Sequence, residues 1–157
     1  MQGHGAEPPR EPQREAAEQL ADAGEAIAGL MREVAASVEP RLTPPGLRVM
    51  TVVSDSPGRN LTAVATAVGL SVPRASRVCA ALESAGLLLR RPAATDRREI
   101  GLEVSPGGRA LLDRFGAMRR ERMAAVLRRM PAEERCALVA ALEELGLAVA
   151  AVGSEGG

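Results

Sequence analysis

The sequence of 157 residues contains no tryptophan, no tyrosine and no lysine, and one phenylalanine, Phe115. Its core must therefore be built from Leu, Val, Ala and Met. Stacking of bases on aromatic side chains is excluded as a binding mode, which argues against a reader of single-stranded RNA or DNA. The cysteines, Cys79 and Cys136, and the single histidine, His4, provide neither a metal cluster nor a Cys–His pair. With no catalytic constellation, we expect no enzyme and no cofactor.

Long apolar runs are also missing. No run approaches 18 consecutive apolar residues, so we expect no transmembrane helix and no membrane partner. The first twelve residues lack the apolar segment of a signal peptide, which makes a cytoplasmic protein the default expectation. A reducing compartment argues against a disulfide between the two cysteines.

The formal net charge of the chain is zero, but positive and negative charges are distributed unevenly along it. Residues 1–39 carry a net charge of −5, residues 40–130 carry +9 and residues 131–157 carry −4. Every basic residue is arginine, which suits both phosphate and guanine, although a nucleotide bias of the genome would have the same result. A basic middle between acidic ends favours a polyanionic partner for the middle of the chain.

Periodicity and turn residues predict a mostly α-helical chain with a small β-wing, of the α+β class. Thr43, Asn60 and Ser71 are candidate N-caps, and Gly69 and Gly86 are candidate C-terminal glycines. Gly46 lies inside a predicted helix at a cost of ~1 kcal/mol relative to Ala, so it either makes room near a cleft or weakens that helix. The predicted order is a disordered tail 1–12, helices 13–38, 44–53, 61–68 and 72–85, strands 87–90 and 98–104, helices 106–129 and 131–152, and a frayed tail 153–157.

The pair of short helices at 61–68 and 72–85 has the spacing of a helix-turn-helix. Helical geometry places Ala75, Val78, Cys79, Leu82 and Ala85 on one face, which we expect to be buried, and small or polar residues on the other. Arg77 and Ser76 suit contacts to base edges, whereas Arg74, Arg90 and Arg91 suit phosphates. A solvated amphipathic helix is the alternative interpretation. The candidate DNA-binding residues are Ser71, Pro73, Arg74, Ser76, Arg77, Arg90, Arg91, Asp96, Arg97 and Arg98.

A β-hairpin directly after the second helix makes this interpretation more specific. Its loop carries Asp96, Arg97 and Arg98, and a carboxylate at 96 can orient the guanidinium at 98 toward a minor groove. The strand at 98–104 alternates Ile100, Leu102 and Val104 with polar or small residues, which predicts one wet face. The alternative is an exposed Asp96–Arg98 ion pair of little energetic value.

These motifs resemble the MarR family of winged helix-turn-helix transcriptional regulators. The resemblance rests on the order of four segments, and it extends over about residues 15–150. Val72 and Pro73 depart from the polar or basic residues that the family often has at the start of the recognition helix. The matching segments are Leu61 to Ser71, Arg77-Val78 with Leu82 to Leu87, Asp96-Arg97-Arg98 with Ser105 to Leu112, and Pro131 to Arg135.

The resemblance implies a homodimer in which helices 13–40 and 105–152 pair across a two-fold axis, while residues 41–104 form the DNA-binding lobe. It also implies an effector cleft between these parts, with Leu47, Met50, Phe115 and Met118 as candidate lining residues for a small apolar compound. Plain core is the alternative for these four. Cys79, on the buried face, is expected to be an inert thiol rather than an oxidant sensor.

The sequence therefore predicts a homodimeric, sequence-specific regulator of transcription, acting as a repressor on a pseudo-palindromic double-stranded operator and released by a small effector. The alternative function is a winged-helix protein–protein interaction module that has lost specific DNA binding. Val72, Pro73 and the zero net charge motivate that alternative.

Overall fold

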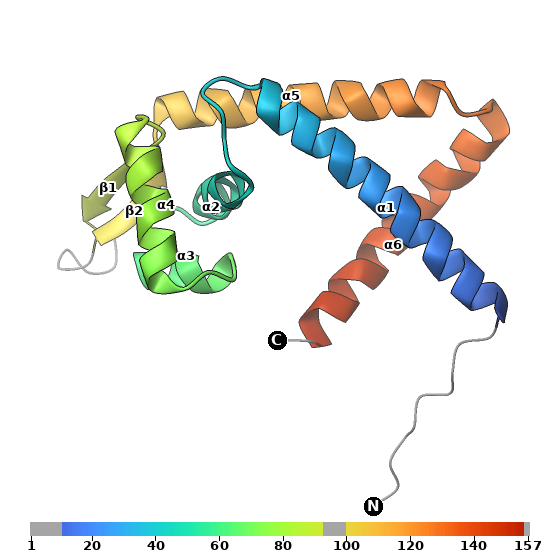
Figure 1. Cartoon of the computed structure of the whole chain (residues 1–157), viewed down its shortest axis with the longest axis horizontal. Coiled ribbons are helices and arrows are strands. Elements are labelled where there is room, and N and C mark those ends of the chain that lie inside the picture. Colours follow the sequence, from blue (N-terminus) through green and yellow to red (C-terminus); the bar gives the residue numbers. More distant parts are fainter. Residues whose placement is uncertain (1–10, 93–99, 156–157) are drawn as a thin grey trace, which may run out of the picture. The chain divides into compact units, whose positions relative to one another are not determined.

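The computed structural model describes residues 11–92 and 100–155 (Figure 1). Two compact units divide the chain, residues 1–118 and residues 119–157, so that one helix contributes to both. Residues 1–10 of the predicted tail 1–12 lie outside the described residues, and the first helix already begins at Glu11. The elements are α1 (Glu11–Ser37), α2 (Pro44–Asp55), α3 (Leu61–Ala67), α4 (Val72–Ser84), β1 (Leu88–Pro92), β2 (Ile100–Val104), α5 (Pro106–Arg128) and α6 (Ala132–Glu155).

Local side-chain chemistry sets the start of the short helices. The hydroxyl of Thr43 accepts a hydrogen bond from the Gly46 amide at 3.2 Å, and the Asn60 side chain accepts one from the Ala63 amide at 2.9 Å. Both satisfy amides that lack a partner in a first helical turn. Ser71 does occupy the N-cap position of α4, but its side chain makes no capping hydrogen bond there.

Glycines in the left-handed conformation end α3 and α4. Gly69 has φ +66° and Gly86 has φ +71°, a region in which a side chain is strained. The Leu70 amide then donates to Ala65 O, and the Leu87 amide donates to Leu82 O, both at 2.9 Å. These turns bring α4 across α3 and lead the chain from α4 directly into the sheet, as the sequence predicts.

The sheet consists of antiparallel β1 and β2, with Leu88 opposite Val104 and Pro92 opposite Ile100. A short stretch after α2 pairs with the other edge of β2, because the Gly58 amide donates to Leu102 O and the Leu102 amide donates to Arg59 O. This segment at Gly58 and Arg59 covers Gly101, whose Cβ, if present, would overlap the Gly58 backbone. The predicted alternation is therefore wrong at two positions: Gly101 is buried and Ile100 is exposed.

One hydrophobic core lies within the first unit. It joins α2, α3, α4, the sheet and the first half of α5, which cluster around α4 in Figure 1. Gly108 lets α5 approach closely, since a Cβ there would overlap Leu87 O and lie 2.9 Å from Met50 Cε. The largest fully buried side chains are Met50, Leu88, Leu102, Leu111, Val34, Val49, Val53, Val64 and Cys79.

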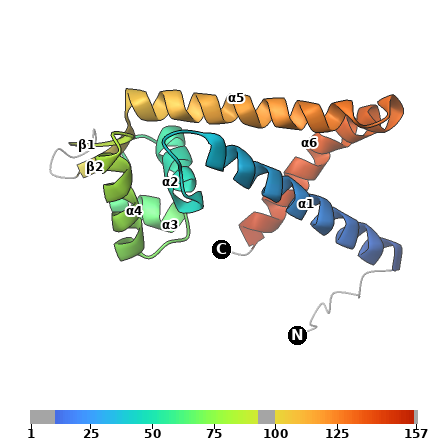
Figure 2. The same ribbon diagram turned by 45° about the horizontal axis from the view of Figure 1, so that its top comes forward.

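The second unit is a helical hairpin, the end of α5 followed by α6, the red helix in Figure 2. Among its residues 119–153 the structure has no fully buried side chain. By length and composition alone, the segment Ala132–Gly153 is long and apolar enough to cross a membrane. The sequence predicts no membrane helix, because Glu143 and Glu144 divide this segment into two shorter apolar runs. The predicted fraying from 153 is wrong as far as Glu155, which remains helical.

Candidate nucleic-acid interface

The recognition helix, α4, is exposed along the side that the sequence assigns to DNA. Ser71, Pro73, Arg74 and Arg77 are exposed, and Ser76 is half-buried. The helix is anchored from its other side by Ala75, Cys79 and Leu82, which are buried in the core. The buried face of α4 is therefore narrower than the sequence predicts.

Two residues of that predicted face are not buried. Val78 is half-buried and Ala85 is exposed. Both line a cavity beside α4, so the apolar side of the helix continues into an open hollow rather than into packed core. Helical periodicity gives the direction of a side chain but not what covers it.

Both arginines of β1 form ion pairs with glutamates of the same chain. Arg90 Nε lies 2.6 Å from Glu83 Oε1 of α4, and Arg91 Nε lies 3.7 Å from Glu103 Oε2 of β2. The Glu83 side chain is 26% exposed, so its pair with Arg90 is partly shielded from water. We therefore interpret Arg90 first as a tie between the recognition helix and the wing, and as a phosphate contact second.

The predicted tip of the wing, with Asp96, Arg97 and Arg98, lies outside the described residues. The two strands that carry it are well paired, with the register already given. The base of the wing is thus held to α4 through the Glu83–Arg90 pair. Its contacts to DNA stay a prediction.

Ser105 is a residue whose role the sequence interpretation missed. Its buried hydroxyl donates to Gly86 O at 2.6 Å and accepts from the Gly108 amide at 2.9 Å. The Ser105 amide also donates to Leu87 O. One side chain thus joins the end of the recognition helix to the start of α5. The sequence Ser-Pro-Gly-Gly is a recognisable N-cap signal, but the partner 19 residues earlier is not readable from it.

Cys79 is fully buried behind the recognition helix. Burial raises the pKa of its thiol, and the nearby Glu83 carboxylate raises that pKa further, while Arg90 lowers it. A buried thiol whose protonated form is favoured is a poor nucleophile. These features support the interpretation of Cys79 as a packing residue. Cys136 is exposed on α6.

A cavity of about 620 Å³ lies between α1, the start of α2 and Phe115 of α5. Leu47 and Phe115 line it, as predicted for the effector cleft. Met50 does not, since it is fully buried in the core, and Met118 lines a separate small hollow with Arg114. The charged residues of the cavity lining are all arginine: Arg32, Arg41 and Arg48.

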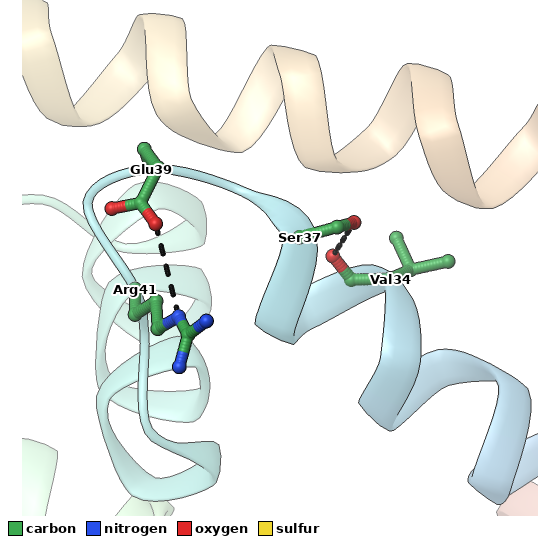
Figure 3. Close-up of polar contacts among 4 residues, drawn as sticks. All are labelled: Val34, Ser37, Glu39 and Arg41. Carbon is green, nitrogen blue, oxygen red and sulfur yellow. Dashed lines mark hydrogen bonds and ion pairs between the residues drawn. The ribbon is translucent and has the colours of Figure 1, made fainter.

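Arg41 lies on the loop that joins α1 to α2, where Figure 3 shows its Nε paired with Glu39 Oε1 at 3.7 Å. Both side chains are more than three-quarters exposed, so this pair contributes little to stability. The loop is fixed by its backbone instead: Arg114 Nη2 donates to Glu39 O at 2.6 Å, and the Ser37 hydroxyl donates to Val34 O. Arg41 is thus an exposed, weakly paired cation in the lining of the cavity.

No group of three or more His, Cys, Asp or Glu side chains with the spacing of a metal site occurs in the parts of the chain that the structure describes. The chemistry of these parts is instead that of arginine: an exposed helix bearing Arg74 and Arg77 beside a two-stranded wing. This arrangement defines a winged helix-turn-helix protein, a class that binds double-stranded DNA.

Comparisons with known proteins show what this chain is similar to. Residues 42–100 match the MarR family model. RV1404 from Mycobacterium tuberculosis is 27% identical, with a TM-score of 0.75 over 93% of this chain and 98% of that one. RV2887 from the same organism, a MarR family protein in complex with p-aminosalicylic acid, is 28% identical, with a TM-score of 0.58 over 81% and 98%.

A mutant of MepR from Staphylococcus aureus, bound to an oligodeoxyribonucleotide, has the same fold at 15% identity, with a TM-score of 0.66 over 85% of this chain and 97% of that one. Among curated protein sequences, none is similar enough to match. Residues 42–100 thus match the MarR family, and the chain has the fold of MarR-family transcriptional regulators, as its motifs indicate.

Proposed function

We propose that this protein is a homodimeric repressor that binds a pseudo-palindromic operator and is released by a small effector. The observation that carries DNA binding is the exposed face of α4, where Arg74 and Arg77 are free of ion pairs with the described residues. Such a face enters a major groove, and Arg77 would read guanine there. The DNA-bound MepR mutant, of the same fold, supports this use of the fold.

The second unit supports the homodimer. A hairpin without a buried side chain does not offset the conformational entropy lost when its residues are ordered. Its exposed apolar residues include Val139, Leu142 and Leu147. A bilayer would be a poor environment for Glu143 and Glu144, halfway along the apolar segment. A second copy of the chain, which leaves these carboxylates at a wet edge, is the better partner, and we expect the protein in the cytoplasm.

The large cavity supports the effector. Its apolar walls together with Arg32, Arg41 and Arg48 suit an amphipathic anion, rather than the purely apolar compound that the sequence suggests. The complex of RV2887 with p-aminosalicylic acid, an aromatic carboxylate, is consistent with this chemistry. Bound there, between α1 and α2, such a compound would shift the DNA-binding lobe between two positions of different affinity for operator.

The test is to select genomic fragments with the purified full-length protein and to measure their binding at several salt concentrations. We expect affinity to fall steeply with salt. Arg77→Ala should cost ~1–3 kcal/mol and relax the preference at one base position, whereas Arg74→Ala should weaken all fragments equally and lower the salt slope by about one. Salt-insensitive or absent binding would instead favour the protein–protein interaction module.

A further inference from the structure

Val72, the first residue of the recognition helix, is a large apolar side chain that the core does not use (Figure 1). It is 42% exposed, and among the described residues of the lobe at 41–104 the other exposed large apolar residue is Ile100, on the wing. Val72 belongs neither to the hydrophobic core nor to the half-buried apolar residues that pack against it, whereas Val78 of the same helix does pack against it. Packing therefore does not account for a valine at position 72.

The backbone that carries Val72 is nevertheless fixed. The Ala75 amide donates to Ser71 O at 2.9 Å, which closes the first turn of α4. Pro73 lies in this turn, and its ring sets its φ to a helical value. A valine in a helix has one strongly preferred χ1 rotamer. The methyl groups of Val72 are thus exposed in a defined direction, and little conformational entropy is lost when they contact a partner.

The surface of α4 changes from apolar at its start to polar one turn later. Val72 and Pro73 are both exposed, and Pro73 has neither a polar side chain nor an amide hydrogen. Val72 lies one turn before Ser76 on the same stripe of the helix. Pro73 lies one turn before Arg77 in the same way. The first turn therefore has little with which to bind the polar edge of a base, although it continues the surface that carries Arg77.

The start of a recognition helix is the part that contacts base edges in the major groove. The apolar group that a base pair presents there is the C5-methyl group of thymine. Cytosine has no such methyl group, and it presents its N4 amino group as a donor instead. A valine that covers this donor leaves it without an acceptor, which costs free energy. An exposed valine at the start of α4 therefore favours thymine and disfavours cytosine.

We propose that Val72 determines specificity at one base pair of each half-site by packing against the C5-methyl group of a thymine. This role rests on the proposed function, and it adds a second base contact to that of Arg77 with guanine. The five residues from Val72 to Arg77 span ~7.5 Å along a helix axis, which is about two base-pair steps of ~3.4 Å. With α4 along the groove, the thymine is expected about two base pairs from the guanine.

The experiment replaces thymine with uracil, which deletes the C5-methyl group and leaves the pairing edge of the base unchanged. The DNA is an operator duplex taken from the genomic fragments that the full-length protein selects. One thymine at a time is replaced, symmetrically in both half-sites, and Kd is measured by fluorescence anisotropy at a single salt concentration. We expect one thymine at which uracil weakens binding about fourfold per half-site, or about fifteenfold for a dimer on both half-sites.

Two matched variants separate a base contact from a packing effect. Val72→Ala and Val78→Ala make the same change in the same helix, one at an exposed residue and one at a residue that packs against the core. With Val72→Ala, the effect of uracil on the dimer should fall below about twofold, because the contact with the methyl group is already lost. With Val78→Ala, the protein should be less stable in urea, but the effect of uracil should stay about fifteenfold.

Arg77→Ala provides a second control within the binding surface. It should weaken binding to both the thymine and the uracil duplex, and leave the ratio of the two dissociation constants unchanged, because Arg77 contacts a different base pair. A ratio that falls with Arg77→Ala as much as with Val72→Ala would show that the two residues act as one contact and would overturn a separate role for Val72.

The proposal is also overturned if no thymine of the half-site responds to uracil, or if the full response persists with Val72→Ala. In the second case, the methyl group would act through the shape of the DNA or through another residue. Specific binding without any dependence on the methyl group would overturn this role alone. Absence of sequence-specific binding to any fragment would overturn the proposed function together with it.

Discussion

The winged-helix part of the chain and the hairpin at its C-terminal end use the same apolar residue types with opposite results. Leu102 and Leu111 in the first unit are at most 1% exposed, whereas Leu142 and Leu147 in the second are 46% and 63% exposed. In the first unit, helices and a sheet cross at angles that close a core. In the second unit, each of two helices can pack only one of its faces against the other, so the remaining apolar side chains stay exposed. One region closes its core within a single chain, whereas the other leaves its apolar side chains exposed.

Introducing negative charge on the apolar face of the hairpin tests this contrast with the largest expected effect. Leu142→Glu combined with Val149→Glu should raise the dimer dissociation constant by ~10³ or more, since each carboxylate buried in an interface costs several kcal/mol. Sedimentation equilibrium measures the constant. The methyl spectrum of Val64, Leu82 and Leu102 is the control and should stay unchanged. An unaltered dimer would mean that α6 is not its interface.

Truncation of one leucine in each region sharpens the contrast. Leu102→Ala should lower the free energy of unfolding by ~2–5 kcal/mol, because it leaves a cavity in a closed core. Leu147→Ala should cost little in dilute protein, and its cost should grow with protein concentration as the dimer forms. Denaturant unfolding at two protein concentrations measures both. Equal, concentration-independent losses would contradict the difference between the two regions.

Removal of one hydroxyl tests the junction between the recognition helix and α5. Ser105→Ala deletes a buried group that bonds both Gly86 O and the Gly108 amide, and should cost ~1–2 kcal/mol. Ser37→Ala is the matched control: Ser37 is an exposed residue whose hydroxyl bonds one carbonyl within its own helix, and its loss should cost less than ~0.5 kcal/mol. Similar losses from both variants would show that the junction is not special.

Features set by neighbouring residues could be predicted from the sequence, and those set by distant chain segments could not. Thr43, Asn60, Gly69 and Gly86 act within a turn of where they stand, so their roles as caps are readable. Gly101 is buried because a segment more than 40 residues earlier pairs with β2. No alternation of residue types within the strand carries that information.

The site divides in the same way. The exposed side of α4 follows from helical periodicity, and so do Arg74 and Arg77 on it. The pairing of Arg90 with Glu83 and the burial of Met50 depend on how α4 meets β1 and how α2 meets α5. Arg41, which lines both cavities, lies on the loop that joins α1 to α2, a segment for which the sequence predicts no role in a site.

The cysteines provide the smallest test, since each region contains one. Burial and Glu83 raise the pKa of the folded Cys79 thiol. The folded state therefore retains this proton after the unfolded chain has lost it. The stability that this contributes is fully present below the unfolded thiol pKa, near 9, and is lost as pH rises toward the folded value.

As pH rises above about 9, the free energy of unfolding should thus fall with a slope of up to ~1.4 kcal/mol per pH unit from this group. Cys79→Ala lowers stability at every pH, but it should remove this slope, whereas Cys136→Ala, at an exposed position on α6, should retain it. Urea unfolding at several pH values measures both variants. A slope that disappears with Cys136→Ala instead would mean that the thiol of the hairpin, and not that of the closed core, is the one withdrawn from water.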